Sequence, residues 1–218
     1  MIAAVVFDLD GVLVDSEAAW DEARRELVRE EGGTWKESAT RDMLGMSSLE
    51  WSRYVADELG VKLPPEEISS RVVGELLAVY RRKLPLLPGA TAAVERLGAR
   101  WPLGLASSSN PEVIALALSA SGLDRRFSAW VSSEEVGPGK PAPDVYLEAA
   151  RRLGVEARDC VAIEDSENGI NSADAAGMRV IAIPNHDFPP PDRVLALADH
   201  VAASLDELTV DLVERVGT

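Results

Sequence analysis

The chain has 218 residues, of which 46% are hydrophobic, so it has enough apolar side chains for a globular core and is not a disordered chain. Its net charge is −15, from 37 acidic and 22 basic residues, which disfavours a nucleic-acid-binding protein because such proteins normally present a basic surface. An anionic small-molecule substrate is not excluded, but it needs a local cation.

The single cysteine, Cys160, rules out an intrachain disulfide, which fits a reducing compartment. It lies in the apolar run CVAIE, where we expect it to be a buried packing residue. The N-terminal apolar run has no basic segment and is broken at Asp8, so it is not a signal peptide. The sequence contains no stretch of about 18 uncharged apolar residues, so no transmembrane helix is predicted. We therefore expect a cytoplasmic protein that binds neither membrane nor nucleic acid, as a monomer or weak homo-oligomer.

The first predicted strand is the apolar run IAAVVF (2–7), which leads directly into Asp8 and Asp10. Residues two apart in a strand face the same side, so both carboxylates can address one ligand. Two carboxylates at the end of an apolar element are costly unless something positive holds them. Gly11 follows at once and lets the chain turn abruptly beside them.

Residues 17 to about 86 contain charge-dense helical patterns and no strand-like run. Turn-prone segments bound this region, at 11–16 before it and at PLLPG (85–89) after it. We predict an all-helical insert between the first strand and the rest of an α/β domain. The alternative, a helical N-terminal domain followed by a separate sheet domain, would leave strand 2–7 too short to be stable alone.

Beyond the insert, short apolar runs alternate with helical patterns. We predict strands at 102–107, 129–133, 160–164 and 179–184, and helices at 89–99, 110–121, 143–153 and 168–176. Strand–helix alternation with short loops is typical of a parallel sheet covered by helices on both faces.

Polar side chains follow four of these strands, and ligands bind at the carboxyl ends of strands in open α/β sheets. The residues in question are Asp8, Asp10, Ser107, Ser108, Asn110, Lys140, Glu164 and Asp165. Hard oxygen ligands with no cysteine or histidine nearby favour Mg²⁺ over zinc. A lysine and serine hydroxyls can bind phosphate oxygens, as can a backbone N–H near a helix start, here that of Ser108.

This set of residues suits phosphoryl transfer to a carboxylate. We expect Asp8 to attack phosphorus and form an aspartyl-phosphate. Asp10 would protonate the leaving alcohol and then deprotonate the water that hydrolyses the intermediate. Magnesium and Lys140 would overcome the repulsion between the carboxylate and the phosphate.

Four segments carry a family resemblance: DLDGVLVDS, ASSSN, GKPAPDVY and IEDSENGINSADAAGM. In order and spacing they resemble the motifs of the haloacid dehalogenase superfamily, in the branch of β-phosphoglucomutase and sugar-phosphate phosphatases. The resemblance covers essentially the whole chain. It implies a Rossmann-like core at 1–15 and 87–218 and an inserted all-helical cap domain at 16–86.

The resemblance also implies roles for individual residues. Asp8 would be the nucleophile and Asp10 the acid/base, with Ser107 and Lys140 binding phosphate. Mg²⁺ would be held by Asp8, the carbonyl oxygen of Asp10, and Asp165, with Glu164 in or next to that shell. Asn110 and Asn168 would line the site.

Departures from the family pattern favour one reaction. The dehalogenases usually carry a non-acidic residue at the position of Asp10, so the acid here favours phosphoryl transfer. Sequences similar to β-phosphoglucomutase usually place a histidine in the first cap helix and basic residues around a cap loop, where this chain has Trp20, Leu44 and Ser48. A cap without those basic residues has no evident binding site for a second phosphate. A mutase needs such a site to return its phosphoryl group to the sugar.

We therefore predict a magnesium-dependent phosphatase for a small phosphomonoester of the sugar or polyol phosphate class. One alternative is a phosphosugar mutase. Another is a non-enzymatic phospho-acceptor of the receiver type, which should lack the helical insert, and a third is a partner-binding protein with a vestigial site. We expect the cap's apolar loop 43–51 to recognise charge weakly, and the acidic helix 17–31 to present a solvated face. Trp20, Met43 and Trp51 are expected to pack within the cap, whereas Met46 can face the cleft.

Overall fold

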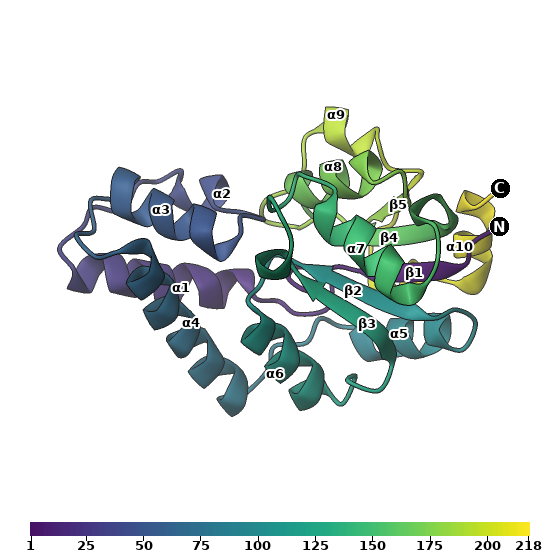
Figure 1. Cartoon of the computed structure of the whole chain (residues 1–218), viewed down its shortest axis with the longest axis horizontal. Helices are drawn as coiled ribbons and strands as arrows, with labels where there is room; N and C mark the ends of the chain where they lie inside the picture. Colours follow the sequence, from purple (N-terminus) through teal and green to yellow (C-terminus); the bar gives the residue numbers. More distant parts are fainter.

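The computed structural model describes residues 1–218, and its centre is a six-stranded sheet in the order β3-β2-β1-β4-β5-β6 (Figure 1). All neighbouring strands are parallel. The strands are β1 (Ala4–Phe7), β2 (Leu103–Ser107), β3 (Phe127–Ser132), β4 (Cys160–Glu164), β5 (Arg179–Ala182) and β6 (His200–Val201). The predicted parallel sheet is confirmed, although β3 begins at Phe127 and not at Ala129.

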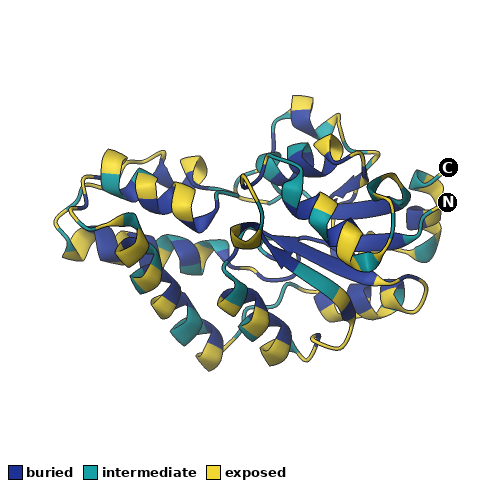
Figure 2. Cartoon of the chain, in the orientation of Figure 1, coloured by how far each residue is buried: buried dark blue, intermediate teal, exposed yellow.

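Helices cover both faces of this sheet, as the alternation of patterns predicts. One layer consists of α5 (Ala90–Gly98), α6 (Pro111–Ser121) and α10 (Val210–Val216), and the other of α7 (Asp144–Leu153), α8 (Glu167–Ala175) and α9 (Asp192–Leu195). Strand β1 supplies both layers, because alternate side chains point to opposite faces: Val5 and Phe7 join the first cluster, Ala4 and Val6 the second. Figure 2 shows the helices exposed on their outer sides; β1, β2 and β4 are buried throughout, and the edge strands β3 and β6 are partly exposed.

Four of the five helices between β1 and β2 in the chain extend away from the sheet (Figure 1). They are α1 (Glu17–Glu30), α2 (Ala39–Asp42), α3 (Ser48–Glu58) and α4 (Pro65–Arg82), and α4 packs against α1 and α3. The buried residues of α1 are Trp20, Ala23, Arg24, Leu27 and Val28. Their spacing of three and four residues is that of an amphipathic helix, so α1 buries one stripe and exposes the rest.

The helices are an insert, because β1 pairs with both β2 and β4 in the centre of the sheet. A separate N-terminal helical domain is therefore excluded, while the boundaries at residues 16 and 86 stay a prediction. The two connecting segments run side by side: the N–H of Asp15 donates to the carbonyl of Pro85 (2.8 Å), and that of Leu87 to the carbonyl of Leu13 (3.0 Å). No helix in the protein has both the length and the apolar character needed to cross a membrane.

Candidate active site

The carboxyl ends of β1, β2 and β4 meet at one edge of the sheet. Phe7, the last residue of β1, pairs with Leu105 on one side and Ile163 on the other, so the residues that follow all three strands lie at one level. Asp8 continues β1, and its N–H donates to the carbonyl of Ile163 (3.0 Å). Strands β2 and β3 lie on one side of β1, and β4, β5 and β6 lie on the other. The order of strands therefore reverses between β1 and β4, and open α/β sheets bind ligands at such a switch point.

Lys140 enters this edge from the loop after β3 and is 3% exposed. Its Nζ donates to Asp8 Oδ1 (2.8 Å) and to Glu164 Oε1 (2.6 Å). Burial disfavours the charged amine, but Asp8 and Glu164 outweigh burial, so the pKa of Lys140 lies above its ordinary value. Lys140 is therefore a buried cation that bridges two strand ends.

Asp8, Glu164 and Asp165 each offer an oxygen atom, and these atoms all lie within 4.8 Å of one another. Burial raises the pKa of Asp8 to about 8 against the opposing effect of Lys140, with Glu164 and Asp10 adding to the rise. Burial and the neighbouring carboxylates likewise raise the pKa of Asp165. Carboxyl groups buried together either keep a proton or need a cation in addition to the single lysine.

The hydrogen bonds show which of these carboxylates is open to a further ligand. Asp8 Oδ2 accepts no hydrogen bond, and Asp165 accepts only a long one from Asn185 Nδ2 (3.5 Å). Gly11 lies against Asp165: its φ is +78°, and a Cβ at this position would lie 1.9 Å from Asp165 Oδ2. The glycine that follows the two aspartates thus serves both the turn and the close approach to Asp165. The oxygen-only donor set fits a hard divalent cation held by Asp8 and Asp165.

Glu164 is different, because it is completely buried and its oxygens are already in use. They accept hydrogen bonds from Lys140 Nζ (2.6 Å), Tyr146 OH (2.7 Å), Ser166 Oγ (3.2 Å) and the backbone N–H groups of Asp165 (3.1 Å) and Ser166 (3.4 Å). Gly169 makes room for this carboxylate, since a Cβ there would lie 1.9 Å from it. Glu164 is therefore best placed to hold Lys140. Tyr146 is a contact that sequence reasoning missed, although it stands within the segment GKPAPDVY.

Asp10 lies beyond the strand and is held by side chains from both the core and the cap. Its Oδ2 accepts from Ser109 Oγ (2.7 Å) and Ser107 Oγ (3.3 Å), and its Oδ1 accepts from Trp20 Nε1 (3.2 Å) of α1. Ser109, to which the sequence pattern assigns no role, makes the shortest of these bonds. Trp20 packs against Trp51 within the cap, as expected, and its indole N–H also contacts a candidate catalytic residue across the gap between cap and core.

Ser108, a predicted phosphate binder, and Asn110, predicted to line the site, use their side chains to hold the cap. Ser108 Oγ donates to the carbonyl of Gly45 (2.9 Å), and Asn110 Oδ1 accepts from Ser48 Oγ (2.6 Å). Asn168, predicted to line the site, donates from Nδ2 to the carbonyl of Leu44 (2.8 Å). The cap loop is thus fastened to the core in this conformation.

A cavity of about 40 Å³ remains between the cap and Asp10. It is lined by Asp10, Glu17, Trp20, Arg24, Met43, Gly45, Met46, Trp51, Ser108 and Ser109. Met46 therefore faces the site, as predicted. The charged residues Glu17 and Arg24 are unexpected here, because helix 17–31 is predicted to present a solvated face.

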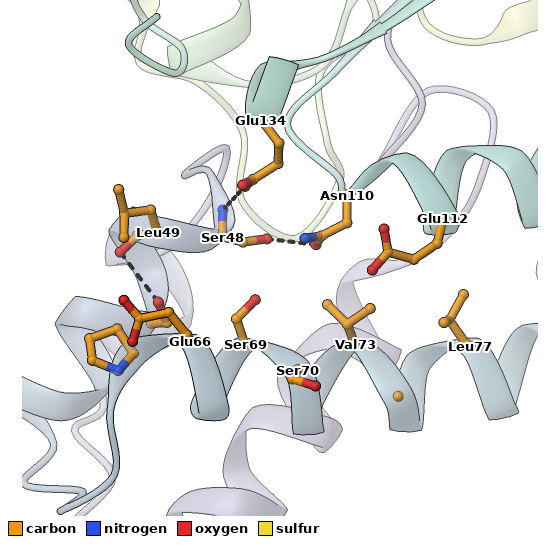
Figure 3. A pocket seen from close by; sticks show the side chains of 13 residues that line it. Ser48, Leu49, Glu66, Ser69, Ser70, Val73, Leu77, Asn110, Glu112 and Glu134 are labelled. Carbon is orange, nitrogen blue, oxygen red and sulfur yellow. Dashed lines mark hydrogen bonds between the residues drawn. The ribbon is translucent and has the colours of Figure 1, made fainter. Parts of the chain in front are cut away.

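A larger groove of about 520 Å³ lies between α4 and α6, at the outer rim of the contact between cap and core (Figure 3). Ser69, Ser70 and Val73 of α4 face Asn110 and Glu112 across it. It contains none of the buried carboxylates and no cation, so it lacks the groups that the predicted chemistry needs.

A parallel sheet with clustered carboxylates and a lysine at its carboxyl edge, beneath an inserted helical cap, is the arrangement of a capped hydrolase with a Rossmann-like core. The chain belongs to the haloacid dehalogenase-like hydrolases, whose family description matches residues 2–177.

Named relatives lie within the same group. Hexitol phosphatase B of Escherichia coli (strain K12) is 35% identical over 211 residues, which cover 95% of each chain. Phosphorylated carbohydrates phosphatase of Thermotoga maritima is 32% identical over 179 residues, 82% of this chain and 83% of the relative. The solved structure of CbbY from Rhodobacter sphaeroides, in complex with xylulose-(1,5)bisphosphate, superposes with a TM-score of 0.87 at 27% identity and covers 98% of this chain and 99% of that one.

Proposed function

We propose that the protein is a magnesium-dependent phosphatase that hydrolyses a small phosphomonoester of the sugar or polyol phosphate class. The observation that carries the proposal is the state of Asp8. Its carboxylate is buried, one oxygen is fixed by Lys140, and the other accepts no hydrogen bond. A nucleophile needs this combination of fixed orientation and a free lone pair.

In the proposed reaction, Asp8 Oδ2 attacks phosphorus and the ester oxygen leaves as an alcohol. Asp10 donates the proton to that oxygen and later takes one from the water that cleaves the aspartyl-phosphate. Ser107 and Ser109 hold Asp10 from the core, and Trp20 holds it from the cap. Lys140 keeps Asp8 oriented and offers positive charge to the phosphate, and the Ser108 N–H offers a hydrogen bond. The Ser107 hydroxyl has one proton, so it donates to the phosphate only after releasing Asp10.

We propose that Mg²⁺ is held by Asp8, Asp165 and the carbonyl oxygen of Asp10, with Glu164 next to that shell. When bound, the ion would offset the negative charge of the phosphate and the carboxylates. The saturated hydrogen bonding of Glu164 supports its place beside the shell, and the free oxygens of Asp8 and Asp165 support theirs.

The substrate class is inferred from the relatives. A hexitol phosphatase and a phosphorylated carbohydrates phosphatase both release phosphate from oxygen-rich carbon chains, as their names state. The four helices above the sheet disfavour the receiver-type alternative, which should lack them. A phosphosugar mutase remains the alternative reaction on the same site, and it would return the phosphoryl group to the sugar.

The test is release of inorganic phosphate from a panel of sugar and polyol monophosphates with Mg²⁺ present. We expect turnover by the wild type and a fall in kcat of at least about 10³-fold in Asp8→Asn. Asp124→Asn, on an exposed aspartate, is the matched control and should retain full activity. A stable phosphoprotein without phosphate release would identify a phospho-acceptor, and an isomerised sugar phosphate would identify a mutase.

A further inference from the structure

Arg24 is a buried cation without a partner. It is 6% exposed, its Nε is completely buried without a hydrogen-bond partner, and none of its nitrogens forms a hydrogen bond or an ion pair. Charged side chains that are this deeply buried are normally paired. An arginine with all its donors free is therefore available to bind a ligand that accepts hydrogen bonds.

Two indole rings hold Arg24 in place. Its guanidinium carbon lies 4.9 Å from the ring centroid of Trp20 and 4.9 Å from that of Trp51. The two rings contact each other edge to face, with centroids 5.9 Å apart. Cation–π contacts stabilise the charge through the ring faces but use none of the N–H donors. The arginine is thus fixed while its hydrogen-bonding capacity stays available.

Arg24 also lies beside the reaction site. Arg24 lines the small cavity that also contains Asp10, Ser108 and Glu17. The floor of this cavity carries the candidate acid/base, so whatever occupies the cavity during turnover is the part of the substrate bonded to the leaving oxygen. At about 40 Å³ the cavity holds little more than a water molecule, so a whole leaving group enters only when the cap lifts.

The charges around the cavity select between two kinds of leaving group. A second phosphate or a carboxylate would pair with Arg24, but it would also meet Glu17 and Asp10, which are acidic. A hydroxyl both donates and accepts, so neighbouring hydroxyls can accept from Arg24 and donate to Glu17 at the same time.

We propose that Arg24 is a specificity-determining residue that donates hydrogen bonds to the hydroxyl oxygens of a neutral polyhydroxyl leaving group, while Glu17 accepts from the same group. This inference rests on the proposed phosphatase function. It adds which part of the substrate the cap recognises, namely the leaving group. It predicts preference for polyol and sugar monophosphates over bisphosphates.

The test compares Arg24→Met with Arg25→Met. Arg25 is the adjacent arginine on the same helix, but it is exposed, pairs with Asp21 (2.5 Å) and lies over Trp35 (4.5 Å). Three substrates are used: the best polyol monophosphate of the panel, fructose bisphosphate, and p-nitrophenyl phosphate, whose leaving group has no alcohol hydroxyl groups. We expect Arg24→Met to lower kcat/KM for the polyol phosphate at least about tenfold, mainly through KM, and to lower that for p-nitrophenyl phosphate about threefold or less. Arg25→Met should resemble the wild type on all three.

Equal losses on the polyol and p-nitrophenyl esters would overturn the inference while leaving the phosphatase function intact. A wild-type preference for the bisphosphate that Arg24→Met abolishes would also overturn it, because Arg24 would then bind an anion.

Glu17→Gln gives an independent test if Arg24→Met does not fold. Assayed at about pH 8, above the pKa of Glu17, it should raise the kcat/KM ratio of bisphosphate to polyol phosphate by about fivefold or more, and an unchanged or lower ratio contradicts the proposal. If the wild type hydrolyses no ester at all, the proposed function fails and this inference fails with it.

Discussion

The core and the cap each bury one cation above or beside the reaction site, and the two are supported in different ways. Lys140 of the core is bound to two carboxylates, whereas Arg24 of the cap has two aromatic rings and no anion within pairing distance. In the core half, the cation is already paired before a ligand arrives. The cap half leaves its donors unused. With the roles proposed above, the groups for chemistry and the groups for selectivity reside in separate parts of the molecule.

The largest expected effect comes from replacing Lys140 with methionine. Three buried carboxylates would then lose their only protein cation, so we expect the free energy of unfolding to fall by about 3–5 kcal/mol. Urea denaturation without divalent metal measures this. In the matched variant Arg24→Met no ion pair is broken, and the expected change is within about 1 kcal/mol of the wild type in either direction. Equal losses in the two variants would remove the distinction between the two cations.

Metal binding sharpens the description of the core half. At a hundredfold excess over its dissociation constant, Mg²⁺ should stabilise the wild type by about 3 kcal/mol. Asp165→Asn should lose most of this gain. In EDTA the same variant should be more stable than the wild type, because burial and the nearby Glu164 and Asp8 disfavour the charged form of Asp165. Thermal unfolding with and without Mg²⁺ checks both statements, and a metal-free variant less stable than the wild type would contradict the second.

The pH dependence of stability tests the charge of the cap. Burial raises the pKa of Glu17 from 4.5 to about 7, against the lowering effect of Arg24. The folded protein therefore holds this proton more tightly than the unfolded chain does, and the stability that Glu17 contributes is lost as pH rises between these values. Glu17→Gln does not titrate. It should match the wild type below about pH 4 and exceed it by about 2 kcal/mol above about pH 8. Parallel stability curves for the two proteins would show that Glu17 does not titrate in this range.

The smallest expected effect concerns the rim where cap and core touch. Ser48→Ala removes the hydrogen bond to Asn110, and we expect a loss of about 1 kcal/mol in unfolding free energy. Since this contact lies outside the cavity over Asp10, kcat for p-nitrophenyl phosphate should change by less than about threefold. A large fall in kcat would mean that the rim contact governs the chemistry as well as the closure.

The core was largely predictable from the sequence because its signals are local. Apolar runs of strand length end in polar residues, and the rule for parallel sheets brings those ends together, which is how Asp8, Lys140 and Asp165 come to lie at one edge. What local patterns do not contain is the use of each hydrogen-bonding group. The five donors around Glu164 become visible only when α7 and the loop after β4 are placed in three dimensions.

The cap half was harder to predict, because its contacts cross between two separately packed parts. Charge density in α1 suggested a solvated helix, yet Arg24 lies four residues after Trp20 on the buried stripe. That spacing was a usable signal for a buried arginine. It could not show that the stripe ends above Asp10, since the angle between cap and sheet is set by tertiary contacts such as that between Ser108 and Gly45.

The paired connections between the helical insert and the sheet restrict how the insert can move. A domain joined by one connection can rotate in many directions. Here two connections are hydrogen-bonded to each other, between Asp15 and Pro85 and between Leu87 and Leu13, which favours bending about a single axis. One of these connections starts at Gly11, which lies so close to Asp165 that a Cβ would not fit there. If Asp165 binds the metal as proposed, admission of substrate and the position of this metal ligand depend on the same segment of the chain.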